Sequence, residues 1–119
     1  MELSGFEGIN FKFTDELKQK ADQLEWHLKM FATKDKPKLS RELEKELHCA
    51  GPKIRAMVDY LILEKDIPIG SSGDGYWICT SREEAVEASK HRKQRALKGW
   101  IVGNHLANII KPESQGRLL

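Results

Sequence analysis

Apolar residues recur at spacings of three and four in four stretches of the chain, which is the pattern of helices with one buried face. The first stretch predicts a helix over residues 15–32. Thr14 is its expected N-cap, because a hydroxyl can accept from a free backbone N–H of the first turn. Trp26 lies off the apolar stripe, where it can cover an edge of the core or meet a partner. The stripe consists of Leu17, Ala21, Leu24, Leu28 and Phe31.

A second, short helix follows a polar connector at residues 33–38, in which Pro37 prevents the first helix from continuing. Ser40 is the expected cap of this second helix. Leu43 and Leu47 are one turn apart and therefore share its inner face.

The segment "HCAGP", residues 48–52, ends the second helix. Gly51 tolerates left-handed or extended geometry, and Pro52 suits the first position of a new helix. A third helix is predicted over residues 52–65, and two helices joined by such a tight turn form the helix-turn-helix pattern. The buried face of the third helix consists of Ile54, Met57, Val58, Leu61 and Ile62.

The segment "IPIGSSGDGYWIC", residues 67–79, predicts a β-hairpin, because two β-favouring arms flank a glycine-rich turn at residues 71–75. Pro68 marks the first arm as an edge strand. Alternation of the apolar side chains lets one face pack on the helices while the tip projects. Trp77 is interpreted as a core residue beneath the hairpin, although it and Tyr76 could instead stack on bases.

A fourth and longer helix is predicted over residues 82–110, beginning at a capping box formed by Ser81 and Glu84. Its far end is apolar enough to need a partner. Gly99 and Gly103 either weaken this helix or allow another backbone to approach closely. The residues expected on one face are Leu97, Trp100, Ile101, either Asn104 or His105, and Ile109.

The order helix, helix, turn, helix, hairpin, helix resembles the winged helix-turn-helix fold, and residues 39–78 are similar to the small winged-helix proteins of phages and prophages. The stretch "LSRELEKELHCAGPKIRAMVDYLILEKDIPIGSSGDGYWI" carries this resemblance. It implies a mainly α fold with a small β-hairpin (α+β), a winged helix-turn-helix with a long C-terminal helix. The expected organisation is a flexible or extended segment at 1–13, the winged helix-turn-helix domain at 14–80, a C-terminal helix available for dimerisation at 81–111, and a loose tail at 112–119.

In that family the second helix of the motif, here residues 52–65, enters the major groove of DNA, and the wing touches the backbone or the minor groove. Arg55 is the best candidate to donate two hydrogen bonds to a guanine, and Lys53 lies where a helix N-terminus favours phosphate. Alternatively, both are ordinary solvated cations. The DNA-contacting residues that the resemblance implies are Lys53, Arg55, Ala56, Asp59 and Tyr60 on the helix, with Ser71 and Ser72 at the wing.

The distribution of charge adds a second basic element. Residues 1–89 carry 13 Lys and Arg against 17 Asp and Glu, whereas residues 90–119 carry 7 against 1. The densest basic run, "KHRKQRALK" at residues 90–98, could contact phosphates or could form a solvated helical face. Its candidate DNA-contacting residues are Lys90, Arg92, Lys93 and Arg95.

Catalysis, metal and cofactors are not expected. The four histidines and two cysteines show neither C-x-x-C nor H-x-x-x-H spacing, which argues against a zinc site. The glycine-rich turn lacks the residue order of a phosphate-binding P-loop, and no nucleophile elbow frames a serine.

The sequence also predicts a cytoplasmic protein of a bacterial host cell that does not enter membranes. No apolar run approaches the roughly 20 residues of a membrane-spanning helix. Residues 1–4 lack the basic start of a secretory signal. Cys49 and Cys79 are therefore expected to be free, half-buried thiols.

Two functions are compatible with these features. The first is a double-stranded DNA-binding protein that forms a homodimer through the helix at 82–110, serving as a phage or prophage regulator or binding a replication origin or packaging site. The second is a protein–protein interaction module, since a fold does not fix a function. The acidic balance of residues 1–89 and a turn without Lys or Arg favour the second. Neither function implies a small-molecule substrate.

Overall fold

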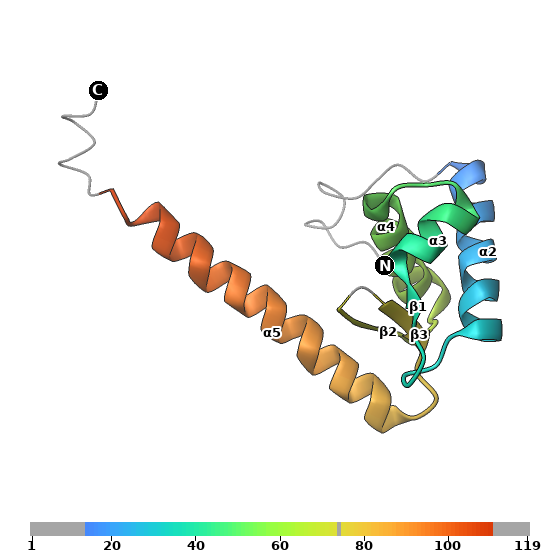
Figure 1. The fold of residues 1–119 in the computed structure, drawn as a ribbon. Coiled ribbons are helices and arrows are strands. Elements are labelled where there is room, and N and C mark those ends of the chain that lie inside the picture. Colours follow the sequence, from blue (N-terminus) through green and yellow to red (C-terminus); the bar gives the residue numbers. More distant parts are fainter. Residues whose placement is uncertain (1–13, 74, 111–119) are drawn as a thin grey trace.

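The structure is a computed structural model that describes residues 14–73 and 75–110 (Figure 1). It is mainly helical with a small three-stranded antiparallel sheet, as the sequence predicts in outline. The segment predicted to be extended at residues 1–13, Asp74 of the predicted turn and the tail at 112–119 lie outside the described residues.

Helix α2, Asp15–Phe31, begins as predicted, with Thr14 Oγ1 accepting from the backbone N–H of Leu17 at 3.2 Å. Ala21, Leu24 and Leu28 of its stripe enter the core, and Leu17 is only partly buried. Phe31 is 56% exposed, so its assignment to the buried face was wrong. The helix ends at this residue, and the buried Ala32 closes that end of the core instead. The Phe31 ring packs edge-on against Trp26, with 5.6 Å between their centroids.

Helix α3, Ser40–Leu47, is capped differently from the prediction. Ser40 is its first helical residue, and Leu39 takes the cap position, where its backbone N–H donates to Glu42 Oε1 at 2.9 Å. His48 then adopts left-handed geometry, with φ of 54°. It is therefore His48 that ends α3, while Gly51 opens the next helix in ordinary helical geometry.

Helix α4, Gly51–Lys65, runs over the predicted range and buries most of its predicted face. Ile62 is only partly buried, because it lies toward the edge of the core. Helices α2, α3 and α4 pack against one another, and Trp77 closes the core from the sheet, as expected of it. The fully buried side chains include Leu24, Leu28, Leu43, Leu47, Ile54, Met57, Val58 and Leu61.

The sheet has the strand order β1-β3-β2. The hairpin strands are β2, Ile69–Ser72, and β3, Gly75–Ile78, so β2 reaches further into the predicted turn than expected. Strand β1, Lys38–Leu39, pairs with β3 on its other side and was not predicted. Two residues are too few to show an alternating pattern.

Helix α5, Arg82–Ala107, begins at the predicted capping box: Ser81 Oγ accepts from the backbone N–H of Glu84 at 3.1 Å. Its first turns pack on β2 through the partly buried Ala85 and Ala88. From residue 90 onward every described residue of α5 is exposed, and the helix projects away from the body of the protein (Figure 1).

Candidate functional site

A cleft of about 300 Å³ lies where α4, the β2–β3 hairpin and α5 meet. We call it the arginine cleft. Its lining carries three guanidinium groups and one carboxylate, a formal charge of +2. The residues that give the cleft its polar character are Arg55, Asp59, Ser71, Tyr76, Arg92 and Arg95.

Two contacts join α5 to the rest of the cleft. Arg92 Nη1 donates to Asp59 Oδ1 of α4 at 3.0 Å. Arg95 Nη2 donates to the hydroxyl of Ser71 on β2 at 3.1 Å. These contacts, with the packing of Ala85 and Ala88, fix the basic part of α5 beside α4 and the hairpin.

The hydroxyl of Tyr76 is a neutral donor in the cleft. Burial raises the pKa of this phenol above its ordinary value of 10.0, and it outweighs the opposite influence of Arg55 and Arg92. The group is therefore protonated at neutral pH and can donate to an anion.

Arg55 and Lys53 lie on different sides of α4, although both are exposed. Two helical positions are about 200° apart, so the two side chains cannot share one face. Arg55 lines the cleft, and within the described residues it has no ion-pair partner. Lys53 lies on the other flank of the helix. There its positive charge acts to lower the pKa of the Cys49 thiol, against the larger effect of burial, which raises it.

The basic run of α5 is divided in the same way. Arg92 and Arg95 line the arginine cleft, whereas Lys90 and Lys93 do not. All four are exposed, and the two lysines lie on the side of α5 away from the hairpin because of the helical repeat. Of the sequence-predicted cations, three therefore converge and three point elsewhere.

The two serines at the wing also separate. Ser71 faces the arginine cleft, while Ser72 lines a smaller hollow on the other face of the hairpin, together with Lys34 and Glu87. Successive residues of a strand point to opposite faces, which explains the division. On α4, Ala56 and Tyr60 are both half-buried and neither lines the cleft.

From the sequence, Ser40 was predicted only as a helix cap and Tyr76 only as a residue that could stack on bases, but both side chains line the cleft. A signal for Tyr76 was present: Ser71 pairs with Tyr76 in the hairpin register, and directly paired residues share a face of the sheet. Ser40 follows immediately after strand β1, which was not predicted.

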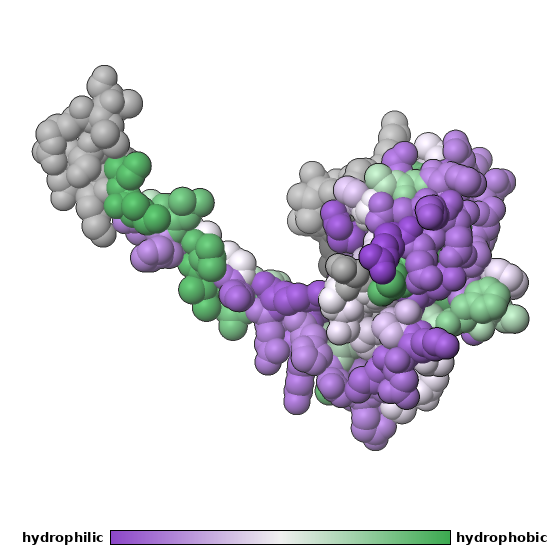
Figure 2. Space-filling view, in the orientation of Figure 1, coloured by the Kyte–Doolittle hydropathy of each residue, from purple (hydrophilic) through white to green (hydrophobic). Residues whose placement is uncertain are grey.

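We call the exposed part of α5, from residue 90 onward, its free part. Large apolar side chains lie along it, and Figure 2 shows them as a hydrophobic stretch beyond the hydrophilic part of the helix. Leu97, Trp100 and Ile101 lie within one face of α5, as predicted, because they fall within about 100° of one another around the helix. Val102 and Leu106 lie outside this face, and Ile109, which was predicted to belong to it, lies beyond the last residue of the helix. The exposed apolar residues of this region are Leu97, Trp100, Ile101, Val102, Leu106, Ile109 and Ile110.

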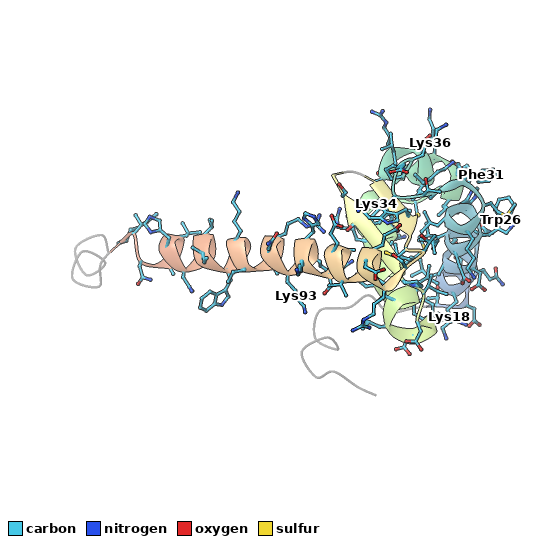
Figure 3. The ribbon with its side chains drawn as sticks, turned by 90° about the horizontal axis from the view of Figure 1, so that it is seen from below. Lys18, Trp26, Phe31, Lys34, Lys36 and Lys93 are labelled. Atoms are coloured by element: carbon cyan, nitrogen blue, oxygen red, sulfur yellow. The ribbon has the colours of Figure 1, made fainter. Side chains whose placement is uncertain are left out.

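A second exposed apolar group lies on α2, at the end of the molecule opposite the projecting α5. Figure 3 shows Trp26 and Phe31 side by side on this outer surface. Trp26 is 53% exposed, and Met30 is exposed beside it. We call these three residues the α2 aromatic patch.

Comparisons with models of protein families, with curated proteins and with solved structures found no match. No helix within residues 14–73 and 75–110 has both the length and the apolar character needed to cross a membrane. Within the same residues, no three His, Cys, Asp or Glu side chains are grouped so that they could hold a metal ion.

Proposed function

We propose that the protein binds double-stranded DNA as a winged helix-turn-helix protein, with α4 in the major groove and the β2–β3 hairpin as the wing. The observation that carries this proposal is the convergence of Arg55, Arg92 and Arg95, from two helices distant in sequence, at the exposed side of α4 next to the hairpin. The major groove of DNA admits a helix such as α4, and the phosphates on either side of the groove attract the cations beside that helix.

In this proposal the residues of α4 and α5 have different roles. Arg55 reads a base edge, most favourably the two acceptors of a guanine. Arg92 and Arg95 contact backbone phosphates and fix the position of α4. The half-buried Ala56 is small enough to let the helix approach the bases. Lys53, on the other flank of α4, can contact the opposite backbone.

Self-association through α5 completes the proposal. Its free part exposes large apolar residues, including Trp100 at 68% exposure. Apart from the adjacent residues and backbone of α5 itself, no atom of the described residues lies within 4 Å of where a Cβ on Gly99 or Gly103 would be, so another backbone can approach there. A homodimer formed in this way presents two α4 helices to half-sites one DNA turn, or roughly 34–36 Å, apart or a multiple of it. A phage or prophage regulator, or a protein that binds an origin or packaging site, would use this arrangement.

Selection of bound sequences from a random duplex pool, followed by gel-shift measurements on the selected site, tests the proposal. We expect recovery of a symmetric sequence. The Arg55→Ala variant should lose discrimination between this site and a scrambled duplex. An absence of any retarded complex, even at low salt, would contradict DNA binding.

The α2 aromatic patch favours a second candidate function, a protein–protein interaction module. Exposed tryptophan is enriched at protein interfaces, and Trp26, Met30 and Phe31 form a group rather than isolated exposed residues. In this case Trp26→Ala should abolish binding of a protein partner, while Arg55→Ala should leave it unchanged.

A further inference from the structure

The arginine cleft contains more positive charge than its own carboxylate can neutralise. Among the described residues, the Asp59 carboxylate forms its ion pair with Arg92, Arg95 donates to the neutral hydroxyl of Ser71, and Arg55 forms no ion pair. Each guanidinium carries five N–H donors, so most donors in the cleft are left for a ligand.

The remaining polar groups suit a tetrahedral oxyanion. Ser71 and Tyr76 face each other in the hairpin register and supply hydroxyl groups to the cleft, whereas the hydroxyl of Ser40, also in the lining, donates to Glu44 Oε2 at 3.2 Å. Guanidinium groups bind phosphate oxygens in pairs, which adds directional specificity to the charge attraction. The cleft therefore offers cationic and neutral donors around one volume of about 300 Å³.

The contact between Arg92 and Asp59 is easily exchanged. Their side chains are 49% and 39% exposed, and exposed ion pairs contribute little to stability. A carboxylate in this position contacts the same guanidinium that an incoming anion would contact. Asp59 thus stands where part of an anionic ligand would bind.

We propose that the arginine cleft binds the phosphate group of a phosphate ester, and that Asp59 takes the place of this phosphate in the free protein. On binding, Arg92 exchanges the Asp59 carboxylate for a phosphate oxygen. The ester is either a phosphodiester of the DNA backbone, in which case the inference rests on the proposed function, or a free nucleotide. Asp59 then lowers affinity for non-specific phosphates, because a ligand must displace it.

Titration calorimetry, combined with amide chemical shifts of Ser71 and Tyr76, tests this proposal with three probes: inorganic phosphate, a deoxynucleoside 5′-monophosphate and a short duplex. Asp59→Asn keeps the shape of the side chain but removes its charge. It should tighten phosphate binding by about two- to fivefold, the equilibrium equivalent of one exposed ion pair. Arg95→Ala should weaken binding of the same probe, whereas Lys90→Ala, which removes an equal charge outside the cleft, should not.

The three probes separate the sources of the phosphate. Tighter binding of the duplex than of the nucleotide, with both dependent on Arg95, identifies the DNA backbone; the reverse order identifies a nucleotide ligand. Phosphate binding without duplex binding would support the cleft and contradict the proposed function. Duplex binding that is unchanged in both Asp59→Asn and Arg95→Ala would overturn the cleft proposal and leave the proposed function in place. Weakened phosphate binding in a folded Asp59→Asn variant would also overturn the cleft proposal.

Discussion

The indole ring of Trp77 lies directly against the α-carbon of Gly70, its partner in the hairpin register. A Cβ built on Gly70 would be only 2.6 Å from two carbon atoms of this ring. The absence of a side chain at Gly70 therefore allows the only tryptophan of the sheet to enter the core. The hairpin thus depends on pairing the largest amino acid, Trp77, with the smallest, Gly70.

Gly70→Ala should consequently destabilise the protein by about 1–3 kcal/mol, the usual cost of overpacking a well-packed site. Urea denaturation followed by tryptophan fluorescence measures this change. Gly103→Ala, measured at a concentration at which the protein is monomeric, is the matched control, because a Cβ there meets no side chain within the chain and should stabilise α5 by roughly 0.5–1 kcal/mol. Equal stability of the Gly70→Ala variant and the parent protein would show that Trp77 does not pack as described.

Trp100→Ala should reduce self-association, because it removes the largest exposed apolar side chain of α5. Sedimentation velocity over a concentration series should show a clear shift toward the monomer. Trp26→Ala removes a comparably exposed tryptophan from α2 and should leave the association unchanged. A stable dimer in the Trp100→Ala variant, or a monomer in the Trp26→Ala variant, would exclude pairing through this part of α5.

The free energy of unfolding should fall in alkaline solution. Burial raises the pKa of the Cys49 and Cys79 thiols above 9.0 and the pKa of Tyr76 above 10.0. Groups with a raised pKa in the folded state stabilise it below the unfolded-state pKa, and this contribution is lost as the pH rises further. Urea midpoints should be constant near neutrality and decrease from about pH 9 upward as the thiols titrate, with the contribution of Tyr76 being lost above about pH 10.

A matched pair of variants checks the origin of this decrease. Cys79→Ala and Tyr76→Phe each remove one titrating group and should each make the decrease shallower. If stability fell as steeply with pH in both variants as in the parent protein, the fall would have to come from other groups.

The local pattern of residues was sufficient to predict the helices and the hairpin. Apolar spacing located α2, α4 and α5, and the Ser81–Glu84 spacing located the start of α5. Phe31 followed the same spacing and is nevertheless exposed, because periodicity does not reveal where the neighbouring elements end.

The candidate site was less predictable, since it depends on contacts between distant segments. Arg92 and Asp59 are 33 residues apart, and no local pattern indicates that they meet. Arg95 lines the cleft and Lys93 does not, but both are cations of the same basic run, so composition alone cannot tell them apart. Only the helical repeat, combined with the contact of α5 on β2, makes this distinction.

The salt dependence of duplex binding tests the central claim, that the arginine cleft faces DNA, most directly. Arg95→Ala and Lys93→Ala each remove one positive charge from α5, two residues apart, but only Arg95 lines the cleft. We predict that Arg95→Ala weakens binding and reduces the slope of log K against log salt by about 1, and that Lys93→Ala retains the slope of the parent protein. Equal slopes for all three proteins, or a loss confined to Lys93→Ala, would contradict the account.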